Sequence, residues 1–308
     1  MDRSLILRRV ILQAATDPRV RRFVDRYGMQ LGGERFVAGT TLPEAVPVLR
    51  RLNEQGLLTN TTILGEHVTE EAAAREVAAA YETVLERIAQ EGLRTNVALK
   101  LTHLGLEFGE DVAFENVSRV VQKAAAVGNF VRIDMEESAL VDATLRIYRR
   151  LREAGHDNVG TVLQSYLFRT ESDLESLLDL RPNLRLVKGA YLEPPSIAYP
   201  LKADVDDAYR RLLERMLTGC SYVGVATHDE QLIQHTLDVA LRGHVPLDRF
   251  GFQMLYGVRP NLQLDLARRG YSVLVATPYG PEWYPYLMRR LAERPANVLF
   301  VARNLLRG

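Results

Sequence analysis

Charged side chains interrupt or follow several short apolar segments of this sequence. Lys100 lies inside the apolar run 97–101, and Asp134 follows the apolar segment that ends at Ile133. Burying a lone lysine or aspartate costs several kcal/mol unless the charge is paired. We therefore predict an ion pair between Lys100 and Asp134 that faces a ligand. The alternative is a purely structural pair inside the core.

Other polar residues stand in or directly after similar apolar segments: Gln164, Arg185, Lys188, His228 and Gln253. For Gln164 and Gln253, a hydrogen-bonded amide in the core is as compatible with the sequence as a ligand contact. The same holds for His228, which could cap a helix or pack in the core. If the segments are strands that end at a common edge, all of these side chains can meet at one site.

A third group of candidate residues lies near the C-terminus. Tyr286, Arg289, Arg290 and Glu293 are spaced i, i+3, i+4 and i+7, so on a helix they share one face. Two adjacent arginines can clamp a carboxylate with forked hydrogen bonds. The alternative is a solvated charged face, and this segment alone does not decide between them.

Neither metal nor disulfide chemistry is predicted. Cys220 is the single cysteine, so the chain cannot form an internal disulfide or a multi-cysteine metal site. The remaining histidines show no spacing typical of zinc ligands. We interpret them as surface or packing residues: His67, His103, His156, His235 and His244.

The segments that must position these residues alternate in type along the chain. Short, often β-branched apolar runs predict strands, and the longer stretches between them have helical period, for example 70–90 and 138–154. The predicted strands are 59–64, 96–101, 130–134, 161–164, 184–188, 222–226, 250–255 and 272–276. Eight strand–helix units favour a TIM-like (β/α)8 barrel, an α/β fold whose core takes about 250 residues.

The residues left over lie at the N-terminus. Two amphipathic helices are predicted there, over 5–27 and 42–55, so we expect an N-terminal helical segment at 1–55 and a barrel catalytic domain at 56–308. The rival fold is an open doubly wound sheet. Such a sheet often carries a G-x-G-x-x-G turn after its first strand, and this sequence contains none.

Composition narrows the classes of function. The 39 Lys and Arg residues balance 39 Asp and Glu residues. A nucleic-acid binder would normally show a basic excess, so no nucleic-acid partner is predicted. No apolar run approaches the length of about 18 residues that a membrane span needs. With no signal-peptide pattern at the N-terminus, we expect a cytoplasmic protein. The amphipathic N-terminal helix is compatible with peripheral membrane contact or with a homo-oligomer.

Taken together, the motifs resemble those of the proline dehydrogenase family, and most closely its short monofunctional bacterial form. The resemblance runs in unbroken order from about residue 42 to the C-terminus. It is carried by LKLT at 99–102, RIDME at 132–136, LQSY at 163–166, RLVKGAY at 185–191, ATH at 226–228 and YLMRRLAE at 286–293.

The resemblance implies a distorted (β/α)8 barrel that holds FAD without a Rossmann fold. It implies flavin-dependent oxidation of L-proline to 1-pyrroline-5-carboxylate, the first step of proline catabolism to glutamate. The electrons would pass to a membrane quinone. A downstream pyrroline-5-carboxylate dehydrogenase is the implied partner.

The resemblance also implies roles for individual residues. Lys100 and Asp134 would contact proline, Arg289 and Arg290 would clamp its carboxylate, and Tyr286 would pack against its ring. Asp134 and Arg185 would be closest to the chemistry, with Arg185 near the reactive edge of the flavin. The other flavin-lining residues would be Met135, Gln164, Lys188, Gly189, Ala190, Thr227, His228 and Glu293.

One position departs from the family pattern. Relatives often carry a tyrosine on the last strand, where this chain has Ala276, and Tyr279 follows three residues later. Whether Tyr279 replaces the missing tyrosine stays open.

Three rival functions also stay open. A Schiff-base aldolase could use Lys100 or Lys188. A non-catalytic barrel could bind proline-like carboxylates, and another flavin-dependent amine oxidase could use the same scaffold.

Overall fold

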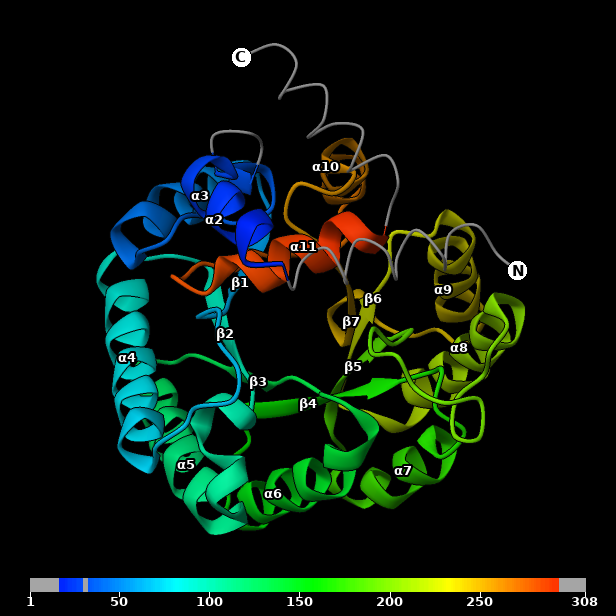
Figure 1. The fold of residues 1–308 in the computed structure, drawn as a ribbon. Helices are drawn as coiled ribbons and strands as arrows, with labels where there is room; N and C mark the ends of the chain where they lie inside the picture. Colours follow the sequence, from blue (N-terminus) through cyan, green and yellow to red (C-terminus); the bar gives the residue numbers. More distant parts are fainter. Residues whose placement is uncertain (1–16, 30–32, 294–308) are drawn as a thin grey trace.

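Eight parallel strands close into a barrel at the centre of the molecule (Figure 1). The computed structural model describes residues 17–29 and 33–293. The strands pair in chain order, and the ring closes where β8 pairs with β1. This order confirms the (β/α)8 barrel and excludes the doubly wound sheet. The strands are β1 Leu58–Thr61, β2 Thr95–Leu99, β3 Val131–Ile133, β4 Val159–Gln164, β5 Asn183–Val187, β6 Tyr222–Ala226, β7 Phe250–Leu255 and β8 Val273–Ala276.

Helices surround the barrel, and two of them depart from an ideal arrangement. In Figure 1, α3 lies between α10 and α4, in the outer position that a helix after β8 would ordinarily take. The helix that does follow β8, α11, lies across the mouth of the barrel instead. The helices are α2 Pro18–Tyr27, α3 Leu42–Glu54, α4 Glu71–Gln90, α5 Glu110–Ala126, α6 Val141–Glu153, α7 Thr170–Leu177, α8 Lys202–Gly219, α9 Glu230–Arg242, α10 Pro260–Arg268 and α11 Trp283–Glu293.

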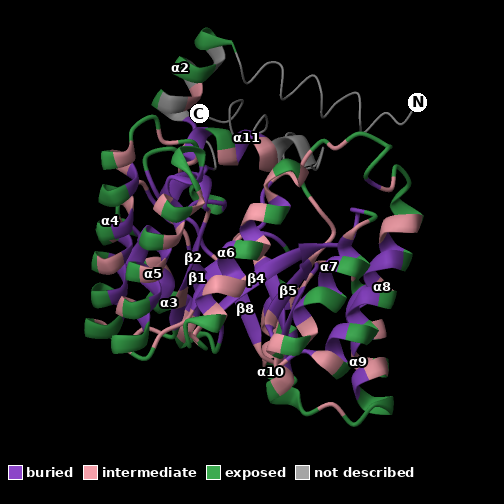
Figure 2. Cartoon of the chain, turned by 90° about the horizontal axis from the view of Figure 1, so that it is seen from below, coloured by how far each residue is buried: buried purple, intermediate pink, exposed green. Residues whose placement is uncertain are grey.

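The main hydrophobic core lies between the barrel and its outer helices. Figure 2 shows the strands as buried and the outer faces of the helices as exposed. The core takes alternate strand residues, such as Val97 and Leu99 of β2, together with the apolar faces of the helices. Ala45 and Leu52 of α3 belong to the same core, which explains how this helix can complete the ring.

A second apolar cluster fixes α11 over the mouth of the barrel. Trp283, Leu287 and Met288 of α11 are buried against Leu64, which follows β1, and Val258, which follows β7. Residues on the opposite face of α11 are therefore held near the carboxyl ends of the strands. This placement distorts the ideal (β/α)8 arrangement, and a distorted barrel is what the resemblance implied.

The N-terminal helix is described only in part. Helix α2 begins after Asp17, whose side chain accepts a hydrogen bond from the amide of Arg19 at 2.7 Å. Pro18 stands at the first helical position, where its missing N–H costs nothing. Residues 5–16 of the predicted helix 5–27 lie outside the described residues. Within the described chain, no helix is both long and apolar enough to span a bilayer.

Candidate active site

Two ion pairs lie at the mouth of the barrel, and neither is the predicted one. Asp134, after β3, accepts a hydrogen bond from Nη1 of Arg185 in β5 at 2.8 Å, and Lys100, after β2, pairs with Glu66. The predicted Lys100–Asp134 pair is therefore wrong. The inward side chains of one barrel layer come from alternate strands, so Asp134 meets a residue of β5 and not one of the neighbouring β2.

Glu66 connects the barrel to α11. Its Oε1 atom accepts from Lys100 Nζ and lies 3.0 Å from Nη2 of Arg289. Burial would raise the pKa of Glu66, but the charges of Lys100 and Arg289 together hold that pKa below its ordinary value. Sequence reasoning missed Glu66. The available signal was an acidic residue soon after the predicted first strand.

Arg185 is held on two sides and open on a third. Its side chain is 11% exposed; Nε donates to Oε1 of Gln253, and Nη1 donates to Asp134. Among the described residues, Nη2 has no hydrogen-bond partner. The guanidinium is therefore held in one orientation, and a donor held in this way can stabilise negative charge on a ligand.

The arginine face of α11 is turned toward the site. Arg289 and Arg290 are both half-buried, and the Arg290 guanidinium lies 5.4 Å from the ring centre of Tyr286. The pair of Arg289 with Glu66 shows that this face is not simply solvated. The side chain of Glu293, the fourth residue of the predicted face, lies outside the described residues.

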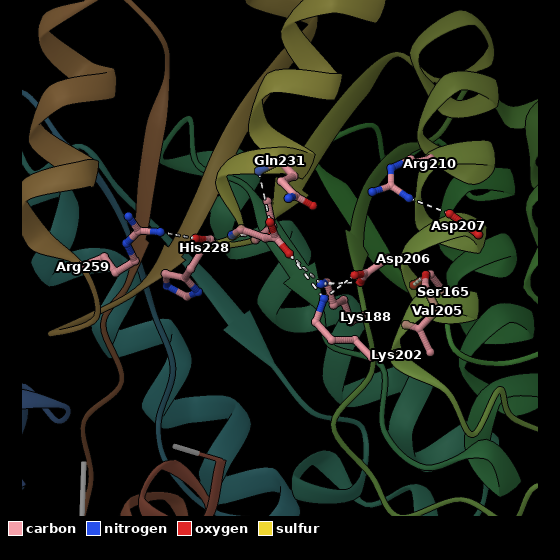
Figure 3. A network of polar contacts seen from close by, with 12 residues as sticks. Ser165, Lys188, Lys202, Val205, Asp206, Asp207, Arg210, His228, Gln231 and Arg259 are labelled. Atoms are coloured by element: carbon pink, nitrogen blue, oxygen red, sulfur yellow. Dashed lines mark hydrogen bonds and ion pairs between the residues drawn. The ribbon is translucent and has the colours of Figure 1, made fainter. Parts of the chain in front are cut away.

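Four alternating charges line the next part of the mouth (Figure 3). Lys188 lies 2.5 Å from Oδ1 of Asp206 and 3.3 Å from Oδ2 of Asp229. Lys202, at the start of α8, contacts the same two carboxylates. Burial would raise the pKa of Asp206 and of Asp229, but the lysines hold both below their ordinary values. Both ammonium groups are therefore fixed in place by anions.

The loop after β6 is held by hydrogen bonds from its neighbours. Nε2 of His228 accepts from the amide of Leu255 at 3.0 Å, and Arg259 donates to the carbonyl of His228 at 2.9 Å (Figure 3). The hydroxyl of Thr227 accepts from the amide of Asp229. Because Nε2 is an acceptor, a neutral His228 carries its proton on Nδ1.

The remaining residues that were predicted to contact the cofactor differ in exposure and in whether they are already hydrogen-bonded. Gln164 is 3% exposed, and its amide donates to the carbonyl of Glu136, so at least one of its two N–H groups serves the core. Met135 is 7% exposed and packs near Tyr166. Ala190 is exposed and lies next to Gly189 in the segment after β5.

Position 189 requires glycine for two reasons, its backbone conformation and the close approach of a neighbouring side chain. Its φ is +121°, a conformation that side chains rarely adopt. A Cβ there would come within 2.2 Å of the ring of Tyr166. The backbone therefore passes close to Tyr166 at Gly189, which lies between Lys188 and Ala190 in the sequence.

Two tyrosines near the site have perturbed acidity. Burial raises the pKa of Tyr191, in the loop after β5, and the carboxylates of Glu136 and Glu66 raise it further. Tyr279 is 5% exposed, and burial raises its pKa. Its backbone bridges to the segment after β1, beside Ile63.

Two surface depressions lie away from these residues. One of about 430 Å³ lies between α7 and α8, and one of about 350 Å³ lies at the amino ends of β1 to β3. Neither contains a predicted site residue. The first is crossed by ion pairs between the helices, such as Arg215 with Glu175. The charged and polar residues that could carry out chemistry lie instead at the mouth, at the carboxyl ends of the strands.

Comparison with known proteins gives consistent matches over nearly the whole chain. A family model described as proline dehydrogenase matches residues 45–303. The chain is 43% identical over 307 residues to the proline dehydrogenase of Deinococcus radiodurans, covering 98% of this chain and 99% of that protein. It is 39% identical over 302 residues to proline dehydrogenase 1 of Bacillus subtilis (strain 168), covering 98% of this chain and 100% of that protein.

A solved structure supports the same fold. Proline utilization A from Bdellovibrio bacteriovorus, inactivated by N-propargylglycine, superposes with a TM-score of 0.80 at 22% identity. The match covers 87% of this chain and 33% of that longer protein.

Proposed function

The chain belongs to the proline dehydrogenase family and is a proline-oxidising enzyme, and on that premise we propose how its residues carry out the reaction. L-Proline is oxidised to 1-pyrroline-5-carboxylate with FAD as cofactor, and the electrons pass on to a quinone. The observation that carries the site assignment is the meeting of Lys100, Arg289 and Arg185 at one mouth, with Glu66 and Asp134 as their counter-ions.

The substrate carboxylate binds to the arginines of α11. Arg289 already holds a carboxylate, that of Glu66, at 3.0 Å, so the substrate competes with Glu66 or shares the guanidinium with it. An arginine can serve two carboxylates because it carries five donors in a planar fork. Arg290 completes the clamp, and Tyr286, which lies under Arg290, packs against the ring of the substrate.

The charges of the site also favour the reactive form of the amine. A protonated secondary amine is a poor hydride donor, because loss of hydride would create a second positive charge. The cations Lys100, Arg289 and Arg290 lower the pKa of a bound amine, while the carboxylates of Asp134 and Glu66 oppose them. Since Asp134 is engaged by Arg185, its opposition is partly compensated.

The residues of the mouth fit a bound dinucleotide cofactor. Nη2 of Arg185 has no hydrogen-bond partner among the described residues, so it can donate to the cofactor. Lys188 supplies an ammonium group. Gly189 has no Cβ, so the backbone can lie close to Tyr166. Lys188 would face the anionic part of the cofactor, with Met135, Gln164, Ala190, Thr227, His228 and Glu293 as the other cofactor contacts. Bound FAD supplies the hydride-accepting ring. Beside such a ring, Arg185 would be the residue to stabilise negative charge on its reduced form.

The acceptor and partner assignments follow from family membership alone. We propose a membrane quinone as acceptor, a downstream pyrroline-5-carboxylate dehydrogenase as the consumer of the product, and a cytoplasmic protein with peripheral membrane contact.

The absorbance spectrum of the purified protein tests the core of the proposal. We expect visible flavin absorbance that bleaches when proline is added without air. A colourless protein that borohydride inactivates only in the presence of a carbonyl substrate would instead indicate a Schiff base. Against that rival, Lys100 is engaged by Glu66 and Lys188 by two aspartates, whereas a Schiff-base lysine must present a free amine.

A further inference from the structure

Three alternate strands supply one connected polar layer inside the barrel. Asp134 follows β3, Arg185 lies in β5 and Gln253 lies in β7, and Arg185 bonds to both of the others. Gln253 is 6% exposed. Its Oε1 accepts from Nε of Arg185, while Asp134 accepts from Nη1. The guanidinium is thereby fixed by two acceptors from opposite sides of the barrel.

The link between Arg185 and Gln253 crosses β6, and a glycine makes the crossing possible. Gly224 of β6 is the register partner of Arg185 on one side and of Gly251 of β7 on the other. A Cβ on Gly224 would come within 2.4 Å of Nε2 of Gln253. Any larger residue at this position would therefore displace the glutamine side chain that reaches Arg185.

We propose that Gln253 is a positioning residue for Arg185, and that Gly224 provides the space in which it acts. This inference rests on the proposed role of Arg185 beside the flavin. A glutamine orients the Nε–H group through a neutral oxygen, so it fixes the guanidinium without cancelling its charge. Asp134 cancels part of that charge already, and a second carboxylate would cancel more.

Two substitutions of Gln253 distinguish its effect on the orientation of Arg185 from the effect of an added charge. Q253M removes the acceptor at similar size, and we expect flavin affinity to fall about tenfold, as for loss of a hydrogen bond to a charged group. Q253E keeps an acceptor but adds a negative charge. We expect it to lower the equilibrium constant for flavin reduction about tenfold, or about 30 mV in the two-electron midpoint potential.

A double-mutant cycle shows whether the effect passes through Arg185. In an R185M background, Q253M should have no additional effect on flavin affinity, because the donor that it serves is absent. An equal loss of affinity in both backgrounds would overturn the proposal, as would a wild-type flavin affinity in Q253M together with a wild-type potential in Q253E.

Gly224 and Gly251 provide a matched pair of variants. G224A should weaken flavin affinity as Q253M does, since the new methyl group displaces Gln253. G251A adds a methyl group at the same level of the barrel, where it meets the hydroxyl of Tyr222 at 2.3 Å instead. We expect G251A to keep wild-type flavin affinity. Equal losses in both variants would show a general disturbance of the barrel and would refute the proposal.

Failure of the proposed function would look different. In that case the wild-type protein would bind no flavin or would not bleach with proline, whatever residue stands at 253.

Discussion

Replacing His103 with glutamine should change how the stability of the protein depends on pH. His103 is 9% exposed, and its Nδ1 has no hydrogen-bond partner among the described residues. The imidazole lies against Gly65, where a Cβ would come within 2.4 Å of Nε2. Burial, together with the ammonium of Lys100, lowers the pKa of His103 from 6.5 to about 4.

The sign of the effect follows from proton binding. Between the two pKa values the unfolded chain holds a proton on this imidazole and the folded protein does not, so acid favours unfolding. The stabilisation is fully present above the ordinary pKa of His103 and is lost as the pH falls toward about 4. The pKa difference corresponds to about 3 kcal/mol, of which about 2 kcal/mol is lost between about pH 7.5 and about pH 5.

Urea unfolding of the wild type and of His103→Gln at these two pH values measures the effect. The difference between the two proteins cancels the contribution of carboxylates that titrate in both. We expect the unfolding free energy of the variant to gain about 2 kcal/mol relative to the wild type on going to about pH 5. NMR of labelled histidine gives the imidazole pKa directly.

His67 is a control of opposite sign on the same side of the molecule. It is half exposed, and its hydrogen bond to Glu107 raises its pKa. Its stabilisation is present below the ordinary pKa and is lost as the pH rises through the folded value. His67→Gln should therefore lose stability relative to the wild type mainly in acid. An imidazole of His103 that titrates near 6.5, or a His103→Gln difference that does not change with pH, would refute the reasoning.

Three further predictions concern the site. Arg289→Met should raise the Michaelis constant for proline at least tenfold, as expected when a charged hydrogen bond is lost, while flavin content stays unchanged; an unchanged constant would remove the clamp role. Gly189→Ala should reduce flavin content and lower the melting temperature, because the methyl group strikes Tyr166; an unchanged melting temperature would contradict the close approach, and normal flavin content would contradict the cofactor role of this turn. Turnover at saturating proline should rise with pH as the bound amine deprotonates, and a flat profile across the neutral range would count against the neutral-amine requirement.

The sequence predicted the barrel and most of the residues at its mouth because both depend on local patterns. Apolar runs that end in Lys100, Asp134 or Gln164 identify strands and their carboxyl ends, and parallel strands place those ends together. The one residue pairing that the sequence suggested, Lys100 with Asp134, was wrong. Asp134 pairs with Arg185 because layers alternate around a closed ring, and no local pattern reveals which side chains share a layer.

Glu66 shows a second limit of local patterns. It lies in a loop after β1, where no periodicity constrains the side chain, and its partner Arg289 stands more than two hundred positions later. The contact exists because α11 lies over the mouth instead of joining the outer ring. That placement depends on an apolar face that buries Trp283 and Leu287.

The amino-acid sequence by itself determined the strand–helix alternation, the closed barrel and part of the set of charged groups at its mouth, since each follows from short-range periodicity and from the cost of burying charge. Only the tertiary structure decided which charges neutralise one another and which donor of Arg185 remains open. Those outcomes depend on distances across the barrel. Such distances are fixed by strand register and by small residues such as Gly224, whose importance appears only when its neighbours are in place.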